Sequence, residues 1–209
     1  MIRHIIFDLD NTLYSVRWGL DDFFIVRLRE FVSSWLGMPW IECEPLWKEK
    51  MKLYGTTLEW LVSEKGFTAI DEYFAYLHPE NEADSLPPDP ELRRFLESLP
   101  LPCSILTNSP GFHAERIIKK LGLEGLFQRV FAIENFGLKG KPHASAFQMV
   151  LNFFDIKPEE ALFVDDIPRY VNGYLVMGGK GILLDERDIH KNYPHERIKD
   201  IKELTRFLN

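Results

Sequence analysis

The sequence predicts an α/β fold in which helices cover a parallel sheet. Short apolar runs suited to buried strands alternate with segments of helical periodicity that lead into glycines suited to helix C-caps. A separate stretch, from about residue 15 to 88, carries its apolar residues at helical spacing alone. We therefore expect a parallel α/β core with right-handed crossovers and one α-helical insert.

The expected strands are short enough to be buried on both faces of the sheet. They lie at residues 5–7, 104–106, 130–133, 162–164 and 181–184. Helical periodicity is clearest at residues 113–121, 144–154 and 169–177. This alternation is typical of βαβ units, so neighbouring strands should run parallel.

The expected insert ends at a turn-rich stretch. Segments such as FFIVRLREFVSSWLG and IDEYFAYLH give it helical spacing, and the prolines at 87, 88 and 90 prevent a helix from continuing. All five tryptophans fall inside the insert. We expect residues 1–14 and 89–209 to form the core domain and residues 15–88 to form the helical domain.

Composition excludes several classes of partner. The net charge of −7 and the pI near 5.4 argue against nucleic acid or an anionic membrane surface, since both are negative. No apolar run approaches the roughly 20 residues of a membrane span, and we expect a cytoplasmic protein. Cys43 and Cys103 are too few for a disulfide framework and are expected to be small buried residues. The oligomeric state stays open.

Polar residues follow three of the expected strands at the point where each strand ends. They are Asp8 and Asp10, then Thr107 and Asn108, then Asp165 and Asp166. Open parallel sheets bind ligands beyond the carboxyl ends of their strands, so these side chains should converge on one crevice. Lys141, in the loop GLKGKP after the third run, is expected to join them.

Converging carboxylates repel one another and retain protons unless a cation neutralises them. The expected cluster therefore predicts a metal ion. Its ligands are oxygens, with no thiolate or imidazole in the same segments, which favours Mg²⁺ over zinc.

The segments FDLDNTLY, ILTNS, KPHASAF and ALFVDD, in this order, resemble the four motifs of the haloacid dehalogenase superfamily. The resemblance runs from residue 3 to about 185. It implies a Rossmann-like core, a helical cap inserted between the first two motifs, and a magnesium-dependent phosphatase acting on a small phosphorylated metabolite. FDLDNTLY, YGTTLEWLV and LTNSPGFHAERIIKKLG are further similar to the pyrimidine 5'-nucleotidase branch, which implies nucleoside 5'-monophosphates as substrates.

The resemblance also implies a role for each catalytic residue. Asp8 attacks phosphorus, and Asp10 protonates the leaving alkoxide and then deprotonates the hydrolytic water. Thr107 binds a phosphoryl oxygen, and Lys141 holds Asp8 and the phosphate together. Because Asp10 must hold a proton for part of the cycle, we expect its pKa to lie above the free value.

The resemblance places substrate and metal ligands next to these residues. Asn108 and Ser109 are the expected substrate-binding residues. The expected metal ligands are Asp8, Asp10 through its carbonyl, Asp165 and Asp166. Which of the two adjacent aspartates ligates the metal directly stays open. Tyr170 departs from the pattern, since relatives often carry Asn there.

Plainer explanations exist for several of these residues. Asp8 and Asp10 could be turn residues, and Thr107–Pro110 is expected to form an N-cap box for the following helix as well. His113 either faces the substrate or lies on a helix surface. The glycines at 178, 179 and 181 lack phosphate-loop spacing and predict a turn.

Three other functions remain open at this point. A sugar-phosphate phosphatase or a phosphomutase would use the same nucleophile. A non-catalytic phosphometabolite-binding protein would share the fold, although it would not need both Asp8 and Asp10. A dehalogenase is disfavoured, because such relatives lack the equivalent of Asp10.

Overall fold

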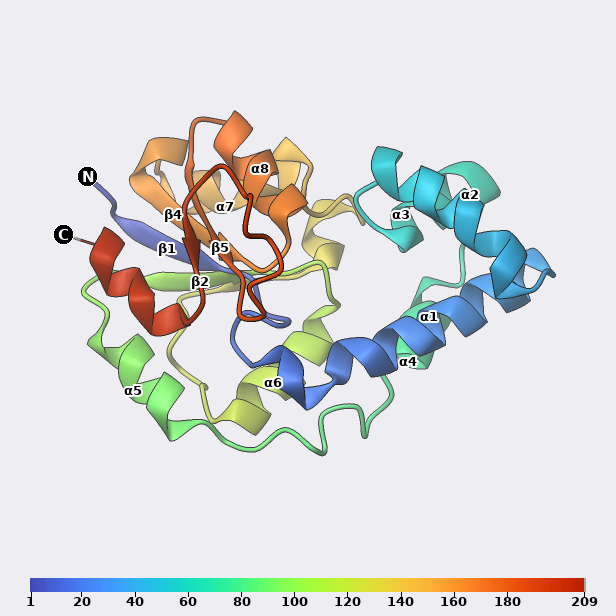
Figure 1. Ribbon diagram of the computed structural model, residues 1–209, viewed down its shortest axis with the longest axis horizontal. Coiled ribbons are helices and arrows are strands. Elements are labelled where there is room, and N and C mark those ends of the chain that lie inside the picture. Colours follow the sequence, from blue (N-terminus) through green and yellow to red (C-terminus); the bar gives the residue numbers. More distant parts are fainter. Residues whose placement is uncertain (209) are drawn as a thin grey trace. The chain divides into compact units, whose positions relative to one another are not determined.

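The computed structural model describes residues 1–208, and its internal contacts divide the chain into two compact units (Figure 1). One unit combines Met1–Arg17 with the segment that starts at Leu86. The other unit is Trp18–Ser85. The borders expected from the sequence, at 14/15 and 88/89, stay a prediction.

The first unit is built on a parallel sheet, as predicted. Within the described residues the sheet has six strands in the order β3-β2-β1-β4-β5-β6, and every printed pairing is parallel. The strands are β1 His4–Phe7, β2 Cys103–Leu106, β3 Val130–Phe131, β4 Ala161–Asp165, β5 Lys180–Leu184 and β6 Arg197–Ile198. β1 lies inside the sheet between β2 and β4, so residues that follow it emerge at the middle of the carboxyl edge.

Two details differ from the strand predictions. The run expected at 130–133 forms a strand only over Val130–Phe131, because a 3₁₀ helix starts at Ile133 and ends at Phe136. β6 was not expected, since two residues are too short to give an alternation signal. The glycine-rich segment before β5 is a turn, as predicted, with Gly178 at a φ of 84°.

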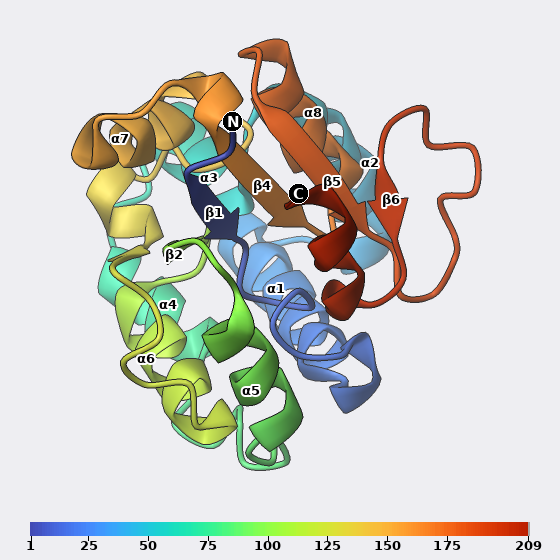
Figure 2. The same ribbon diagram turned by 90° about the vertical axis from the view of Figure 1, so that its left-hand side faces the viewer.

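Helices cover both faces of this sheet (Figure 2). α7 (Ala144–Phe154) and α8 (Pro168–Val176) lie on one face, and α5 (Pro90–Ser98) and α6 (Gly111–Leu121) lie on the other. Buried side chains of these two helices and of the sheet form one apolar cluster, which includes Phe147 of α7, Ile6 of β1 and Phe163 of β4. Such burial is the main favourable term that holds the layers together.

The starts of two helices, α6 and α5, differ from what the sequence predicted. The N-cap box expected at Thr107–Pro110 is wrong, because Pro110 is the N-cap residue of α6 and makes no side-chain cap. The Glu134 carboxylate accepts from Gly111 N–H instead, at 3.1 Å. α5 was not predicted, although Asp89 caps it by accepting from the N–H groups of Glu91 and Leu92.

The second unit is helical, as predicted. Its helices are α1 Leu20–Leu36, α2 Trp40–Leu53, α3 Thr57–Lys65 and α4 Ile70–Leu77. Its interior contains Trp60, which has no exposed surface, and edge-to-face ring contacts of Phe31 with Phe67 and Tyr73. Both cysteines of the chain are free and buried, as expected. Across residues 1–208, no helix is both long enough and apolar enough to cross a lipid bilayer.

Candidate active site

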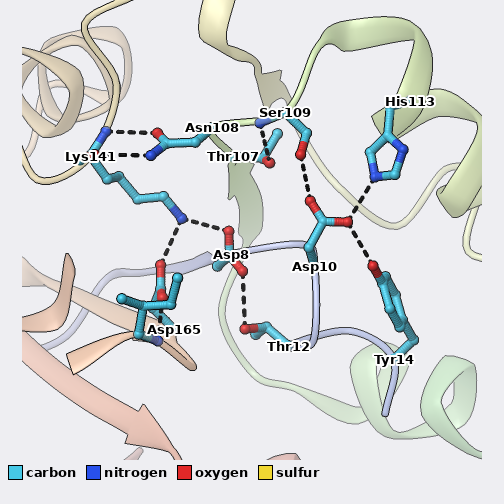
Figure 3. A network of polar contacts seen from close by, with 11 residues as sticks. Asp8, Asp10, Thr12, Tyr14, Thr107, Asn108, Ser109, His113, Lys141 and Asp165 are labelled. Atoms are coloured by element: carbon cyan, nitrogen blue, oxygen red, sulfur yellow. Dashed lines mark hydrogen bonds and ion pairs between the residues drawn. The ribbon is translucent and has the colours of Figure 1, made fainter. Parts of the chain in front are cut away.

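Asp8 lies at the centre of a polar network at the carboxyl end of β1 (Figure 3). Its N–H donates to the Val164 carbonyl on β4 at 2.8 Å, which continues the pairing of the two strands. The Thr12 hydroxyl donates to Asp8 Oδ2 at 3.2 Å. The Asp8 side chain is buried.

Lys141 brings a positive charge to Asp8. Its ammonium donates to Asp8 Oδ1 at 2.5 Å and to Asp165 Oδ2 at 2.6 Å. The ammonium also lies over the rings of Phe163 and Tyr170, at 5.4 and 5.2 Å from their centroids. Lys141 has no exposed surface, so its charge is held inside the protein by these partners. Tyr170, the departure from the family pattern, thus contributes an aromatic face to the Lys141 site.

Asn108 fixes the backbone of Lys141 at two points. Its Oδ1 accepts from Lys141 N–H at 2.7 Å, and its Nδ2 donates to the Lys141 carbonyl at 2.9 Å. The approach is close, because a Cβ on Gly140 would lie 2.0 Å from Asn108 Oδ1. The Asn108 side chain is therefore directed at the loop that carries Lys141.

Asp10 is held by three side-chain donors. Tyr14 OH and His113 Nε2 both contact Asp10 Oδ1, each at 2.7 Å. The Ser109 hydroxyl donates to Asp10 Oδ2 at 2.6 Å. Both carboxylate oxygens are thus engaged, and the orientation of the group is fixed. The Ser109 side chain, expected to bind substrate, is directed at Asp10.

The carboxylates near Lys141 are not fully compensated by its charge. Burial, with added repulsion from Asp165 and Asp10, raises the pKa of Asp8 to about 7 against the attraction of Lys141. Burial likewise raises the pKa of Asp165. Burial alone would lower the pKa of Lys141, but the two carboxylates outweigh it and raise that pKa. A cation bound beside these carboxyl groups would favour their ionised forms.

The expectation of a raised pKa for Asp10 is wrong for this arrangement. Burial raises the pKa of Asp10, but the charge of His113 and the hydrogen bonds from His113, Ser109 and Tyr14 outweigh it and bring the pKa below its usual range. Asp10 is therefore a carboxylate here. Its donors were not apparent from the sequence, and they reverse the sign of the shift.

Three carboxylates could hold a metal ion. Asp8, Asp165 and Asp166 each offer an oxygen, and these oxygens lie within 4.8 Å of one another. An oxygen-only set of this charge fits a hard divalent cation. Both Asp165 oxygens already accept from the chain, one from Lys141 and the other from Ile167 N–H at 2.8 Å.

The structure brings most of the predicted residues into one network. Thr107 is buried after β2, and its hydroxyl accepts from Ser109 N–H at 3.0 Å. The catalytic and metal-binding roles assigned from the resemblance stay predictions. Sequence reasoning missed the contacts of Tyr14 and of His113, which has 3% of its surface exposed. One feature of the sequence could have indicated the role of His113. It lies in the first turn of the helix that follows the strand end at Thr107.

This arrangement defines a hydrolase of the haloacid dehalogenase-like type. The chain belongs to that family, since the family model described as haloacid dehalogenase-like hydrolase matches residues 2–169. The names of its relatives, together with the site, support a phosphatase.

Two curated relatives illustrate the similarity. A phosphoglycolate phosphatase of Mannheimia succiniciproducens is 25% identical over 179 residues, which cover 77% of this chain and 75% of that protein. A glyceraldehyde 3-phosphate phosphatase of Methanocaldococcus jannaschii is 28% identical over 180 residues, which cover 79% and 77%.

Solved structures show the same fold. A HAD phosphatase from Thermococcus onnurineus superposes with a TM-score of 0.68 at 20% identity, covering 100% of this chain and 98% of that one. The HAD hydrolase YfnB from Bacillus subtilis, solved with magnesium, gives a TM-score of 0.66 at 19% identity over 100% and 99%.

Proposed function

We propose that this chain hydrolyses phosphomonoesters through a phosphorylated Asp8, with Mg²⁺ as its metal. The observation that carries the proposal is the contact between Lys141 and Asp8 inside the sheet edge, next to a second, separately held carboxylate, Asp10. A buried carboxylate with a lysine on one oxygen keeps a defined orientation for attack on phosphorus.

The residues of the chain divide the work between them. Asp8 attacks phosphorus with one oxygen while Lys141 holds the other and offsets the negative charge of the phosphate. Thr107 offers a hydroxyl at the adjacent strand end for a phosphoryl oxygen. Asp10, a carboxylate in the arrangement described, is ready to take a proton from the water that cleaves the aspartyl phosphate. In the first step it must carry a proton for the leaving oxygen.

The same residues are the metal ligands in this proposal. We assign Asp8 and Asp166 as direct carboxylate ligands, with the Asp10 carbonyl completing the protein set. Asp165 is assigned to orient Lys141, because both of its oxygens accept hydrogen bonds from the chain. When bound, Mg²⁺ supplies positive charge that lets an anionic nucleophile approach an anionic phosphate.

Small sugar phosphates and phosphorylated acids are the first substrate class to test. The support comes from relatives named phosphoglycolate phosphatase and glyceraldehyde 3-phosphate phosphatase, which align over about three quarters of their length. The pyrimidine nucleotidase assignment rests on short sequence stretches alone. Nucleoside 5'-monophosphates are therefore the second class.

The test is a phosphomonoester panel with Mg²⁺ present and release of inorganic phosphate as the readout. It contains phosphoglycolate, glyceraldehyde 3-phosphate, hexose phosphates, UMP, CMP and AMP. The proposal predicts a kcat/KM at least about tenfold higher for the small phosphates than for the nucleotides. The reverse order would restore the nucleotidase assignment. Isomerised sugar phosphate without phosphate release would indicate a phosphomutase, and binding without turnover of any compound would indicate a sensor.

A further inference from the structure

The third donor to Asp10 comes from a helix rather than from a catalytic loop. Tyr14 and Ser109 follow Asp10 and Thr107 closely in the chain, whereas His113 belongs to the first turn of α6. The imidazole is almost fully buried. The start of α6 is itself anchored, because Glu134 accepts from Gly111 N–H. His113 is therefore held by a fixed element.

We propose that His113 is a positioning residue for Asp10, holding through Nε2 the orientation in which Asp10 exchanges a proton with the leaving group and with water. The inference rests on the function proposed above. It adds a residue that lies outside the segments FDLDNTLY, ILTNS, KPHASAF and ALFVDD.

The geometry shows why this contact matters. His113 Nε2 lies 2.7 Å from Asp10 Oδ1, so the imidazole fixes the position of one oxygen of the Asp10 side chain. Without His113, Asp10 Oδ1 would still accept the hydrogen bond from the Tyr14 hydroxyl. The Asp10 side chain would, however, lose its contact with helix α6. A carboxylate free to turn spends less time aligned with the leaving oxygen, and small misplacements of this kind are costly in catalysis.

Two amide variants of His113 distinguish the effect of losing the hydrogen bond to Asp10 from the effect of losing the imidazole ring. In His113→Gln the amide nitrogen reaches about as far as Nε2, whereas in His113→Asn it reaches only about as far as Nδ1. Each variant is assayed with p-nitrophenyl phosphate, whose leaving group needs little protonation, and with the best alkyl phosphate of the wild type. We expect His113→Asn to lose about 100-fold in kcat for the alkyl ester but under about tenfold for the aryl ester. His113→Gln should recover most of the alkyl activity.

His4 provides the control for removal of a buried histidine. It lies at the start of β1, with Nε2 2.9 Å from the Ser104 hydroxyl, at the opposite end of the strand from Asp8. His4→Gln should leave the ratio of alkyl to aryl activity as in the wild type. If His113→Asn does not fold, His113→Phe replaces it in the comparison of alkyl and aryl esters, because it keeps a ring but has no hydrogen-bond donor.

A double-substitution cycle tests whether His113 acts through Asp10. In the Asp10→Asn background, with the aryl ester as substrate, adding His113→Asn should change kcat by less than about twofold. Equal losses with both esters, or full additivity in this background, would overturn the inference and leave His113 a structural residue. A wild type that hydrolyses no phosphomonoester would instead refute the proposed function, so the two failures are distinct.

Discussion

The Lys141 ammonium donates to Asp8 Oδ1 across 2.5 Å while Lys141 has no exposed surface. The same ammonium donates to Asp165, so one buried cation serves two carboxylates. Removing one partner of a buried ion pair is far more costly than removing an exposed one, because it leaves charge uncompensated in the interior. Stability and activity should therefore both depend on this contact.

Replacing Lys141 by Met should abolish turnover and destabilise the fold in a pH-dependent way. The pKa of Asp8 is already raised to about 7, and loss of Lys141 raises it further. A carboxyl whose pKa is higher in the folded state stabilises the fold at low pH, and this contribution is lost as pH rises through the folded pKa. In EDTA, urea unfolding should show a loss of about 3 kcal/mol or more at pH 8 and a clearly smaller loss at pH 5. An equal loss at both values would contradict the charge argument.

Replacing Asn108 by Ala should lower kcat through Lys141 rather than weaken substrate binding. The change removes both hydrogen bonds to the Lys141 backbone, and an error of about 1 Å in such a group can cost 100-fold in rate. Steady-state kinetics should show kcat down about 10- to 100-fold with KM changed less than about threefold. Asn152→Ala, which removes an exposed contact with Gln148, is the matched control. A raised KM with unchanged kcat would instead support the direct substrate contact expected from the sequence.

Metal removal should stop the reaction. Oxygens of Asp8, Asp165 and Asp166 lie close enough together to share one divalent cation, so EDTA should abolish phosphate release and Mg²⁺ should restore it. Ca²⁺ should not restore it, because it favours more oxygen ligands at longer distances and would tend to engage both oxygens of Asp8. Mg²⁺ should raise the midpoint temperature of thermal unfolding of the wild type. Full activity in EDTA, or equal rates with Ca²⁺, would count against the magnesium site.

His4 should make the fold sensitive to acid. Burial lowers its pKa from 6.5 to about 4, so the unfolded chain binds more protons than the folded one between these values. Its stabilising contribution is complete above pH 6.5 and is lost as pH falls toward 4, by up to about 3 kcal/mol in all. Urea unfolding of the wild type and of His4→Gln between pH 7 and 4.5 measures it. The two curves should converge as pH falls, and a constant gap would contradict the assignment.

Sequence reasoning located the residues whose positions are set by strand ends. Asp8, Thr107 and Asp165 each stand where a short apolar run stops, and parallel strands bring such ends together. Lys141 follows no strand end directly, and its ordered segment KPHASAF was needed to find it. The expectations for Asp8, Thr107 and Asp165 depend only on chain order and on the period of the strands.

The hydrogen-bond partners of the site side chains could not be predicted from strand ends and chain order. Asn108 turns toward the Lys141 backbone and Ser109 toward Asp10, and neither contact was expected from the sequence. Their expected binding of substrate stays a prediction. The pKa of Asp10 is shifted down instead of up, partly because His113 reaches Asp10 from a separate helix. Such contacts depend on helix phase and rotamer, which apolar periodicity does not specify.

The central claim is that Asp8 becomes phosphorylated, and chemical trapping tests it most directly. Wild-type protein is mixed with Mg²⁺ and its best substrate, quenched in acid within one turnover, and treated with borohydride, which reduces an aspartyl phosphate to homoserine. Peptide mass spectrometry should find homoserine at position 8 in the wild type and no such change at Asp10. Asp8→Asn should give no trapped product and almost no turnover, because an amide is a poor nucleophile. Unmodified Asp8 throughout wild-type turnover, or Asp8→Asn that keeps more than a few per cent of activity, would contradict the account.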